Sequence, residues 1–191
     1  PSWSAADIAT SADGPTAVYV GDMDSDGDLD IVSASANDDT IKWHENNGST
    51  NPYFTPREIA TSADEASKVF VADLDGDGDL DVISASANDD KIAWYEYHYG
   101  SFTERSIATS ADEASKIFVA DLDGDGDLDI VSSSRGDDTI AWYENDGAAD
   151  PTFTAADIAT NADGAHDVYV SDIDGDGDLD IVSASSLDDT I

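Results

Sequence analysis

Four short acidic stretches contain the residues best suited to chemistry in this sequence. The first, residues 22–30, reads Asp-Met-Asp-Ser-Asp-Gly-Asp-Leu-Asp, and close copies occupy residues 73–81, 121–129 and 172–180. Each copy has aspartate at positions 1, 3, 5, 7 and 9 and glycine at position 6. Five carboxylates within nine residues repel one another unless a cation lies among them. Because Ca²⁺ takes six to eight oxygen ligands at flexible distances, these acidic loops predict about four Ca²⁺ ions, one per repeat.

The spacing also suggests a role for each position of an acidic loop. The side chains at positions 1, 3 and 5 can turn inward around one ion, and position 7 can offer its backbone carbonyl. Glycine at position 6, Gly27 in the first loop, permits a sharp turn, and Asp30 at position 9 is placed to close the ligand shell. The alternative is a solvated acidic turn without an ion. Four copies with fixed aspartate and glycine positions favour calcium.

The acidic loops begin like the loop of an EF-hand but continue differently. An EF-hand requires glutamate at position 12 and a helix after it, whereas position 12 is serine here. The following residues, such as 29–35, are β-branched and alternate in polarity, which is typical of a strand. The sequence therefore predicts calcium loops that lead into strands. The four residues at position 12 are Ser33, Ser84, Ser132 and Ser183.

The composition and net charge of the chain exclude several kinds of partner. The chain has 191 residues, with 44 Asp plus Glu against 7 Lys plus Arg and a formal charge of −37. We expect no binding to nucleic acid or to anionic membrane surfaces, because both require basic patches. The chain has no cysteine, so we expect no disulfides. It also has no apolar run of about 18 residues, so we expect no membrane insertion. Oxygen-rich calcium sites suit the millimolar calcium outside cells, so an extracellular location, secreted or at the cell surface, is expected.

The acidic loops recur at a period of about 50 residues, and each period contains four short apolar segments. In the first period these are residues 18–20, 29–35, 40–45 and 53–60. Each segment alternates in polarity at every second residue, and none has helical periodicity. Four short antiparallel strands per period are typical of a β-propeller blade. The sequence thus predicts an all-β fold with a single repeat domain over residues 1–191, its blades lying at about 11–61, 62–109, 110–160, and 161–191 plus 1–10.

The two ends of the sequence bear on whether the blades form a closed ring. Residues 1–10 match residues 151–160, the fourth segment of a period, whereas residues 190–191 begin a third segment. The N-terminal segment is therefore expected to complete the last blade and close a four-bladed ring. In the alternative, the chain is part of a larger propeller, and an open strand edge at Ile191 can receive a strand from a neighbouring molecule.

Two further features repeat with the same period. Trp43, Trp94 and Trp142 share one position of the third segment and are expected to pack between blades; a ligand platform is the alternative. Pairs of aspartates lie between the second and third segments and are interpreted as turn residues, with a second cation site as the weaker alternative. These pairs are Asp38–Asp39, Asp89–Asp90, Asp137–Asp138 and Asp188–Asp189.

The acidic loops, with Val-Tyr-Val before them at 18–20 and Leu-Asp-Ile-Val-Ser-Ala-Ser after them at 29–35, resemble the FG-GAP/VCBS repeat family. The resemblance covers essentially the whole chain and implies calcium-binding repeats of an integrin-α-like β-propeller. The Phe-Gly and Gly-Ala-Pro signatures of that family are absent, and residues 12–15 are only a loose echo of them. Family propellers usually have seven blades, so the resemblance also leaves a seven-bladed ring open.

The resemblance implies one set of metal ligands in each acidic loop, with position 7 contributing its backbone carbonyl. These residues are Asp22, Asp24, Asp26, Asp28 and Asp30 in the first loop, Asp73, Asp75, Asp77, Asp79 and Asp81 in the second, Asp121, Asp123, Asp125, Asp127 and Asp129 in the third, and Asp172, Asp174, Asp176, Asp178 and Asp180 in the fourth.

Three functions remain open from the sequence. Calcium loops in every period and nearly identical repeats predict an extracellular structural or adhesion module, with protein or glycan partners and self-association through open strand edges. A carbohydrate-binding, lectin-like propeller is the alternative, because Trp and Tyr rings can stack on sugars. A propeller polysaccharide lyase is less favoured, and no enzyme is expected, because the basic residues do not form a repeated or clustered set. These residues are Arg57, Arg105, Arg135, His44, His98 and His166.

Overall fold

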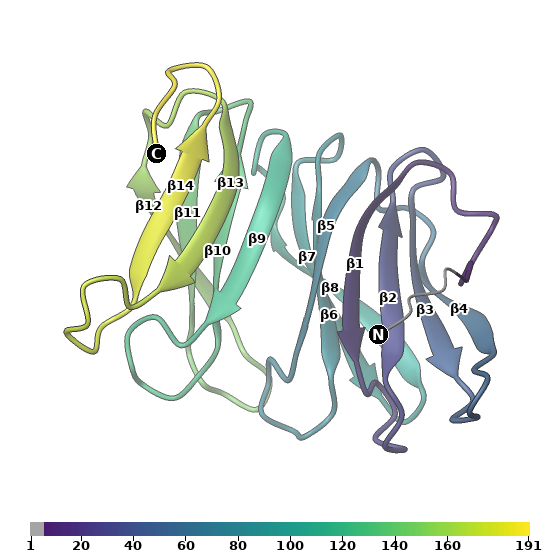
Figure 1. The fold of residues 1–191 in the computed structure, drawn as a ribbon. Coiled ribbons are helices and arrows are strands. Elements are labelled where there is room, and N and C mark those ends of the chain that lie inside the picture. Colours follow the sequence, from purple (N-terminus) through teal and green to yellow (C-terminus); the bar gives the residue numbers. More distant parts are fainter. Residues whose placement is uncertain (1–5) are drawn as a thin grey trace.

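The structure, a computed structural model, describes residues 6–191, which fold into strands and connecting loops (Figure 1). Within this range, fourteen strands form three four-stranded sheets and one two-stranded sheet, and each sheet uses strands that are consecutive in sequence. Every strand pairs with its neighbour in antiparallel register. Among these residues there is no helix of the length and apolarity needed to cross a membrane.

The four sheets, here named blades 1 to 4, follow one another along the chain. Blade 1 contains β1 (Pro15–Gly21), β2 (Asp30–Ser35), β3 (Thr40–Asn46) and β4 (Phe54–Ala60). Blade 2 contains β5 (Ala66–Ala72), β6 (Asp81–Ser86), β7 (Lys91–His98) and β8 (Ser101–Ala108). Blade 3 contains β9 (Ala114–Ala120), β10 (Asp129–Ser134), β11 (Thr139–Asn145) and β12 (Phe153–Ala159), and blade 4 contains β13 (Ala165–Ser171) and β14 (Asp180–Ser185).

The strands form where the sequence alternates between buried and less buried positions. In β5, Val69 and Val71 point to one face and are buried, whereas Lys68 and Phe70 point to the other. The central strand β6 is buried along its whole length, because neighbouring blades cover both of its faces. The all-β class and the four-strand repeat predicted from alternation are confirmed for blades 1 to 3.

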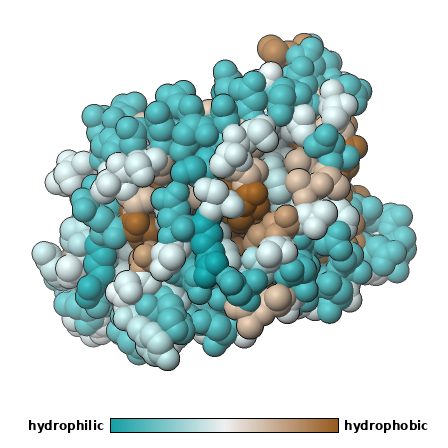
Figure 2. All heavy atoms as spheres, turned by 180° about the vertical axis from the view of Figure 1, so that it is seen from behind, coloured by the Kyte–Doolittle hydropathy of each residue, from teal (hydrophilic) through white to brown (hydrophobic). Residues whose placement is uncertain are grey.

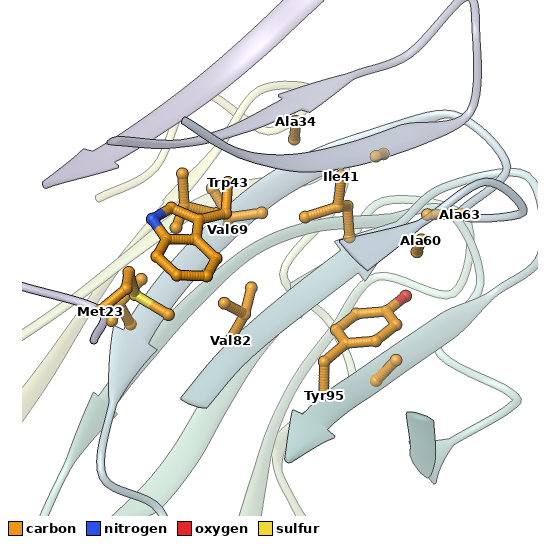
Figure 3. Close-up of a cluster of buried hydrophobic side chains, with 13 residues drawn as sticks. Met23, Ala34, Ile41, Trp43, Ala60, Ala63, Val69, Val82 and Tyr95 are labelled. Carbon is orange, nitrogen blue, oxygen red and sulfur yellow. The ribbon is translucent and has the colours of Figure 1, made fainter. Parts of the chain in front are cut away.

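Successive blades pack face to face in a row, and β1, β5, β9 and β13 lie side by side in that order (Figure 1). Between blades 1 and 2, Trp43 meets Val69, Val82 and Tyr95 in one apolar cluster (Figure 3). Equivalent clusters fill the spaces between blades 2 and 3 and between blades 3 and 4. Trp43 and Trp94 are both buried in such clusters, so the prediction that they pack between blades is confirmed.

Polar contacts also join each blade to the next. Asp39, in the turn between β2 and β3, accepts a hydrogen bond of 3.1 Å from the backbone N–H of Glu65, just before blade 2. The equivalent bonds between blades 2 and 3 and between blades 3 and 4 measure 3.1 and 2.8 Å. Asp39 has a φ of +54°, a conformation that aspartate adopts more readily than most residues. The aspartate pairs are therefore turn residues, as predicted, and their second member also links blades.

The row of blades is not closed within residues 6–191. β1 and β13 lie toward opposite ends of the row, and blade 4 has two strands in place of four (Figure 1). Residues 6–14 contain no strand, and residues 7–12 line a cavity together with residues of β3 and β4. The expected N-terminal strand falls partly on residues 1–5, outside the described residues, so completion of blade 4 by residues 1–10 stays a prediction.

Candidate metal centres

Each acidic loop connects the first strand of its blade to the second and brings three carboxylates together. In every loop, oxygens of these three side chains lie within 4.8 Å of one another. Positions 1 and 3 take part in all four loops, with position 9 in blades 1 and 4 and position 5 in blades 2 and 3. The predicted carbonyl role of position 7 stays a prediction. The clusters are Asp22–Asp24–Asp30, Asp73–Asp75–Asp77, Asp121–Asp123–Asp125 and Asp172–Asp174–Asp180.

The carboxylates at positions 1 and 5 also shape the loop. Asp22 accepts hydrogen bonds of 3.0 Å from the backbone N–H groups of Asp26 and Gly27. Asp26 in turn accepts a bond of 2.9 Å from the N–H of Asp28. The bonds from position 6 to position 1 and from position 7 to position 5 recur in the other three loops. Gly27 has a φ of +93°, which residues with a side chain rarely adopt, so glycine is needed where the sequence predicted it.

The aspartate at position 9 anchors each of the first three loops to the third strand of its own blade. Asp30 is 1% exposed, and its two oxygens accept hydrogen bonds from the N–H groups of Met23 at 3.1 Å and Asn46 at 2.7 Å. Asp81 and Asp129 make the same pair of bonds. Burial raises the pKa of Asp81 to about 7 and also raises the pKa of Asp129. The local sequence did not indicate this anchoring role, because the strand partner lies 16 residues away.

The carboxylate oxygens of the first two loops are suitable ligands for a hard cation. Oδ1 of Asp24 and Oδ1 of Asp73 are buried and have no hydrogen-bond partner. Burial raises the pKa of Asp24, and the neighbouring carboxylates of Asp26 and Asp30 raise it further. Burial likewise raises the pKa of Asp75. A buried anionic oxygen without a partner is costly, and a cation among these oxygens would offset that cost. An all-oxygen donor set is the kind that Ca²⁺ prefers.

The acidic loops differ in how far the rest of the protein covers them. The amide of Asn145 in blade 3 donates a hydrogen bond of 3.0 Å to the carbonyl oxygen of Leu74 in the loop of blade 2. In the loop of blade 1, Asp22 and Asp24 are half-buried, whereas Asp172 and Asp174 in the loop of blade 4 are exposed. The loop of blade 4 is therefore the most open of the four centres.

Arginine side chains cover the buried tryptophans at the outer side of the blades. The guanidinium carbons of Arg57 and Arg105 lie 5.2 Å from the ring centroids of Trp43 and Trp94, respectively. Each arginine also forms an ion pair with a glutamate of its own blade. The side of the molecule seen in Figure 2 is mainly hydrophilic, with apolar patches between hydrophilic areas. Buried indoles covered in this way belong to the core and do not form an open platform for a ligand.

The sequence matches a known repeat at three overlapping places. Residues 22–84, 74–132 and 121–183 each match the FG-GAP-like repeat. No curated protein matches the chain. Eighteen chains of solved structures match it.

One of these solved structures is that of an Agrocybe aegerita lectin, described as specifically recognising non-reducing terminal N-acetylglucosamine. The TM-score is 0.60 and the sequence identity 22%, over 90% of this chain and 47% of the lectin chain. At this identity the likeness concerns the fold, and the present chain spans about half the length of the lectin. The repeat matches, in contrast, extend over residues 22–183, and the chain belongs to the FG-GAP-like repeat family.

Proposed function

We propose that this chain is a calcium-stabilised, β-propeller-like module that serves outside the cell as a structural or adhesion element. The observation that carries the proposal is the presence of buried, unpartnered carboxylate oxygens on Asp24 and Asp73, each within a cluster of three carboxylates. Carboxylates held together in this way repel one another, and a divalent cation turns that repulsion into attraction.

The charge of the whole chain gives the ion a structural role. With a formal charge of −37 and only 7 Lys plus Arg, the protein has few cations of its own to set against five aspartates per loop. Bound calcium lowers the self-repulsion that opposes the folded state. A bound ion would also link carboxylates from the two ends of the loop. Because the aspartate at position 9 is hydrogen-bonded to the third strand, ion binding would stabilise the blade.

Titration of calcium into the chelator-treated protein tests this proposal. We expect about four ions per chain by calorimetry and a higher melting temperature by circular dichroism at moderate ionic strength. Asp73→Asn should remove one ion from the stoichiometry. Asp157→Asn, which changes an exposed carboxylate of β12, is the matched control and should keep all of them. The proposal would be contradicted if the melting temperature were the same with and without chelator, or if Asp73→Asn bound as many calcium ions as the unmodified chain.

Glycan binding is a second candidate function, favoured by two equivalent grooves between blades. One, of about 290 Å³, is lined by residues that include Trp43, Arg57 and Phe102, and the other, of about 250 Å³, by residues that include Trp94 and Arg105. The guanidinium and backbone polar groups of these grooves offer hydrogen bonds to a sugar, and the half-buried rings of Phe102 and Phe153 offer apolar contact beside the buried indoles. The similarity in fold to a lectin that recognises N-acetylglucosamine supports this class of ligand.

A glycan array in the presence of calcium tests the second candidate. The double variant Arg57→Gln, Arg105→Gln should lose the binding shown by the unmodified chain. Arg135→Gln, which changes an arginine that lines neither groove, should retain it. Trp94→Ala cannot serve here, because Trp94 is a core residue. An array without signal for the unmodified chain would argue against glycan binding.

A further inference from the structure

The first strands of the four blades begin around a small pocket, here named the inner pocket. β1, β5, β9 and β13 lie side by side in that order (Figure 1), and residues at or just before the start of each strand line the pocket. Its volume is about 210 Å³. Pockets for drug-sized ligands measure about 300–1,000 Å³, so the inner pocket suits a smaller molecule. The residues that line it include Thr16, Glu65, Ser67, Ser115, Lys116 and His166.

Hydroxyl groups of the wall hold the starts of these strands together. The hydroxyl of Thr16 donates a hydrogen bond of 2.6 Å to the carbonyl oxygen of Ala66 in the next blade. Equivalent bonds from Ser67 and Ser115, each to a carbonyl of the following blade, measure 2.8 and 2.9 Å. Because the same bond recurs at three junctions, the wall of the inner pocket is formed before any ligand binds.

Lysines without a carboxylate partner distinguish the inner pocket from the rest of the molecule. Of the 7 Lys plus Arg in the chain, Lys116 lines this pocket, and Lys68 holds the equivalent position of the adjacent strand β5. Within residues 6–191 neither of these lysines forms an ion pair, although the chain has 44 Asp plus Glu. The other basic residues are all ion-paired: Lys42, Arg57, Lys91, Arg105 and Arg135.

The ammonium group of Lys116 has donors to spare. It is half-buried and donates a hydrogen bond of 3.3 Å to the carbonyl oxygen of Ser115. Burial lowers the pKa of Lys116, and the positive charges of Lys68 and Arg135 lower it further, whereas Asp167 raises it. Like charges on adjacent strands repel each other. A bound anionic group would offset both the burial of the ammonium and this repulsion.

Glu65 adds an unpaired negative charge to the same pocket. Its side chain forms no ion pair among the described residues, whereas Glu113, the other glutamate of the wall, pairs with Arg135 at 3.6 Å. Glu65 and the formal charge of −37 oppose a ligand that is only anionic, and the two lysines oppose one that is only cationic. A small molecule with one group of each sign complements all three side chains and carries no net charge.

We propose that the inner pocket binds a small zwitterion, an α-amino acid, with its carboxylate at Lys116 and Lys68 and its ammonium group at Glu65. Lys68 and Lys116 belong to blades 2 and 3, and Glu65 directly precedes blade 2, so a neighbouring blade lies on either side of the site.

The proposed site is separate from the candidate calcium centres. The acidic loops follow the opposite ends of the same strands, and Asp121 comes five residues after Lys116. Five residues of extended strand measure about 16 Å. Charges at that separation are largely screened, because the Debye length is about 8 Å at physiological ionic strength. Binding of a zwitterion therefore does not depend on the calcium proposal.

Nuclear magnetic resonance of the isotope-labelled chain, with calcium present, tests the proposal. The probes are L-alanine, propionate and ethylamine at equal ionic strength. Propionate is alanine without its ammonium group, and ethylamine is alanine without its carboxylate. L-Alanine should give saturable shifts of the backbone amide signals of residues 65–68 and 113–116. Propionate and ethylamine should each bind about tenfold more weakly or worse, because each lacks one charge-assisted contact.

Three variants show which side chains carry the binding. Lys116→Gln should weaken L-alanine binding by about tenfold. Glu65→Gln should abolish the preference for L-alanine over propionate, which a purely structural role of Glu65 would leave intact. Lys91→Gln is the matched control, because Lys91 is ion-paired with Asp89 and Glu104 and does not line the pocket, and it should keep the affinity of the unmodified chain. Unchanged amide signals away from the pocket show that each variant folds.

Three results would overturn the proposal. The first is the absence of any saturable shift with L-alanine, and the second is a set of shifts confined to residues outside the inner pocket. The third is equal affinity of the unmodified chain for L-alanine and propionate, which would indicate a simple anion site. The melting temperature with and without chelator is measured on the same samples. A chain that binds L-alanine but melts identically in both conditions would contradict the calcium proposal alone.

Discussion

The side-chain amide of Asn145 donates a hydrogen bond of 3.0 Å to the backbone carbonyl oxygen of Leu74, 71 residues earlier in the chain. Asn145 ends the third strand of blade 3, and Leu74 lies in the acidic loop of blade 2. The same amide donates at 3.1 Å to Leu128 in the loop of its own blade. One buried side chain therefore holds two neighbouring acidic loops together.

Replacement of Asn145 should lower the stability of the protein, because both acidic loops lose a hydrogen bond. Asn145→Ala removes the side-chain donor from one buried and one partly buried carbonyl oxygen, which we expect to lower the free energy of unfolding by about 1–3 kcal/mol. Urea unfolding in the presence of calcium measures the change. Asn51→Ala, at an exposed position of the loop between β3 and β4, is the control and should have little effect. Equal unfolding midpoints for the two variants would show that the contact contributes nothing.

Two glycines of the second loop should respond differently to the same substitution. Gly78 has a φ of +97°, whereas Gly76 has a φ of +72°, and the first loop places Ser25 at the corresponding position with a φ of +59°. Gly78→Ser should therefore lower the free energy of unfolding by more than about 1 kcal/mol and weaken calcium binding, with Gly76→Ser costing less. Thermal melting and calcium calorimetry of both variants check this. A larger loss of stability in Gly76→Ser than in Gly78→Ser would exclude backbone conformation as the reason for glycine at position 6.

The strands and the acidic loops could be predicted because both depend on residues close together in sequence. Alternation predicted a segment at 29–35 where β2 spans Asp30–Ser35, and a segment at 53–60 where β4 spans Phe54–Ala60. The glycine at position 6 was equally readable, because a tight turn restricts φ locally.

Contacts between distant residues could not be predicted in the same way. Asp30 appears in the sequence as one more carboxylate of its loop, and only the pairing of β2 with β3 brings the N–H of Asn46 to it. The bond between Asp39 and Glu65 joins residues 26 apart in two different blades. In both contacts the donor is a backbone N–H, which almost every residue has, so the residue types of Asn46 and Glu65 do not indicate the contact.

Trp94 should act as a core residue in any measurement. It is 1% exposed and belongs to the cluster between blades 2 and 3. Trp94→Ala should therefore lower the free energy of unfolding by about 3–5 kcal/mol, through lost burial and the cavity left behind. Trp142→Ala, at the half-buried equivalent position of blade 3, should cost less. Urea unfolding of the two variants compares them, and a wild-type midpoint for Trp94→Ala would contradict the core assignment.

Blade 1 differs from its neighbours by a buried histidine. His44 is hydrogen-bonded to Ser33, with 2.9 Å between Nε2 and Oγ, at the position where Tyr143 lies 3.4 Å from Ser132 in blade 3. Burial lowers the pKa of His44 below its usual value, and the nearby Lys42 lowers it further. The unfolded chain therefore takes up the proton first as the pH falls below about 6.5. Because the unfolded state then binds more protons, the stability of the fold is lost with falling pH in this range.

His44→Tyr should remove this part of the pH dependence. The substitution restores the residue type of blades 2 and 3, and tyrosine does not titrate near neutral pH. Between about pH 6.5 and pH 5, the free energy of unfolding should fall less for His44→Tyr than for the unmodified chain. Urea unfolding at a series of pH values with saturating calcium measures the slopes. His166→Gln, which changes an exposed histidine of β13, is the control and should keep the slope of the unmodified chain. Equal slopes for His44→Tyr and the unmodified chain would show that His44 does not resist protonation in the folded state.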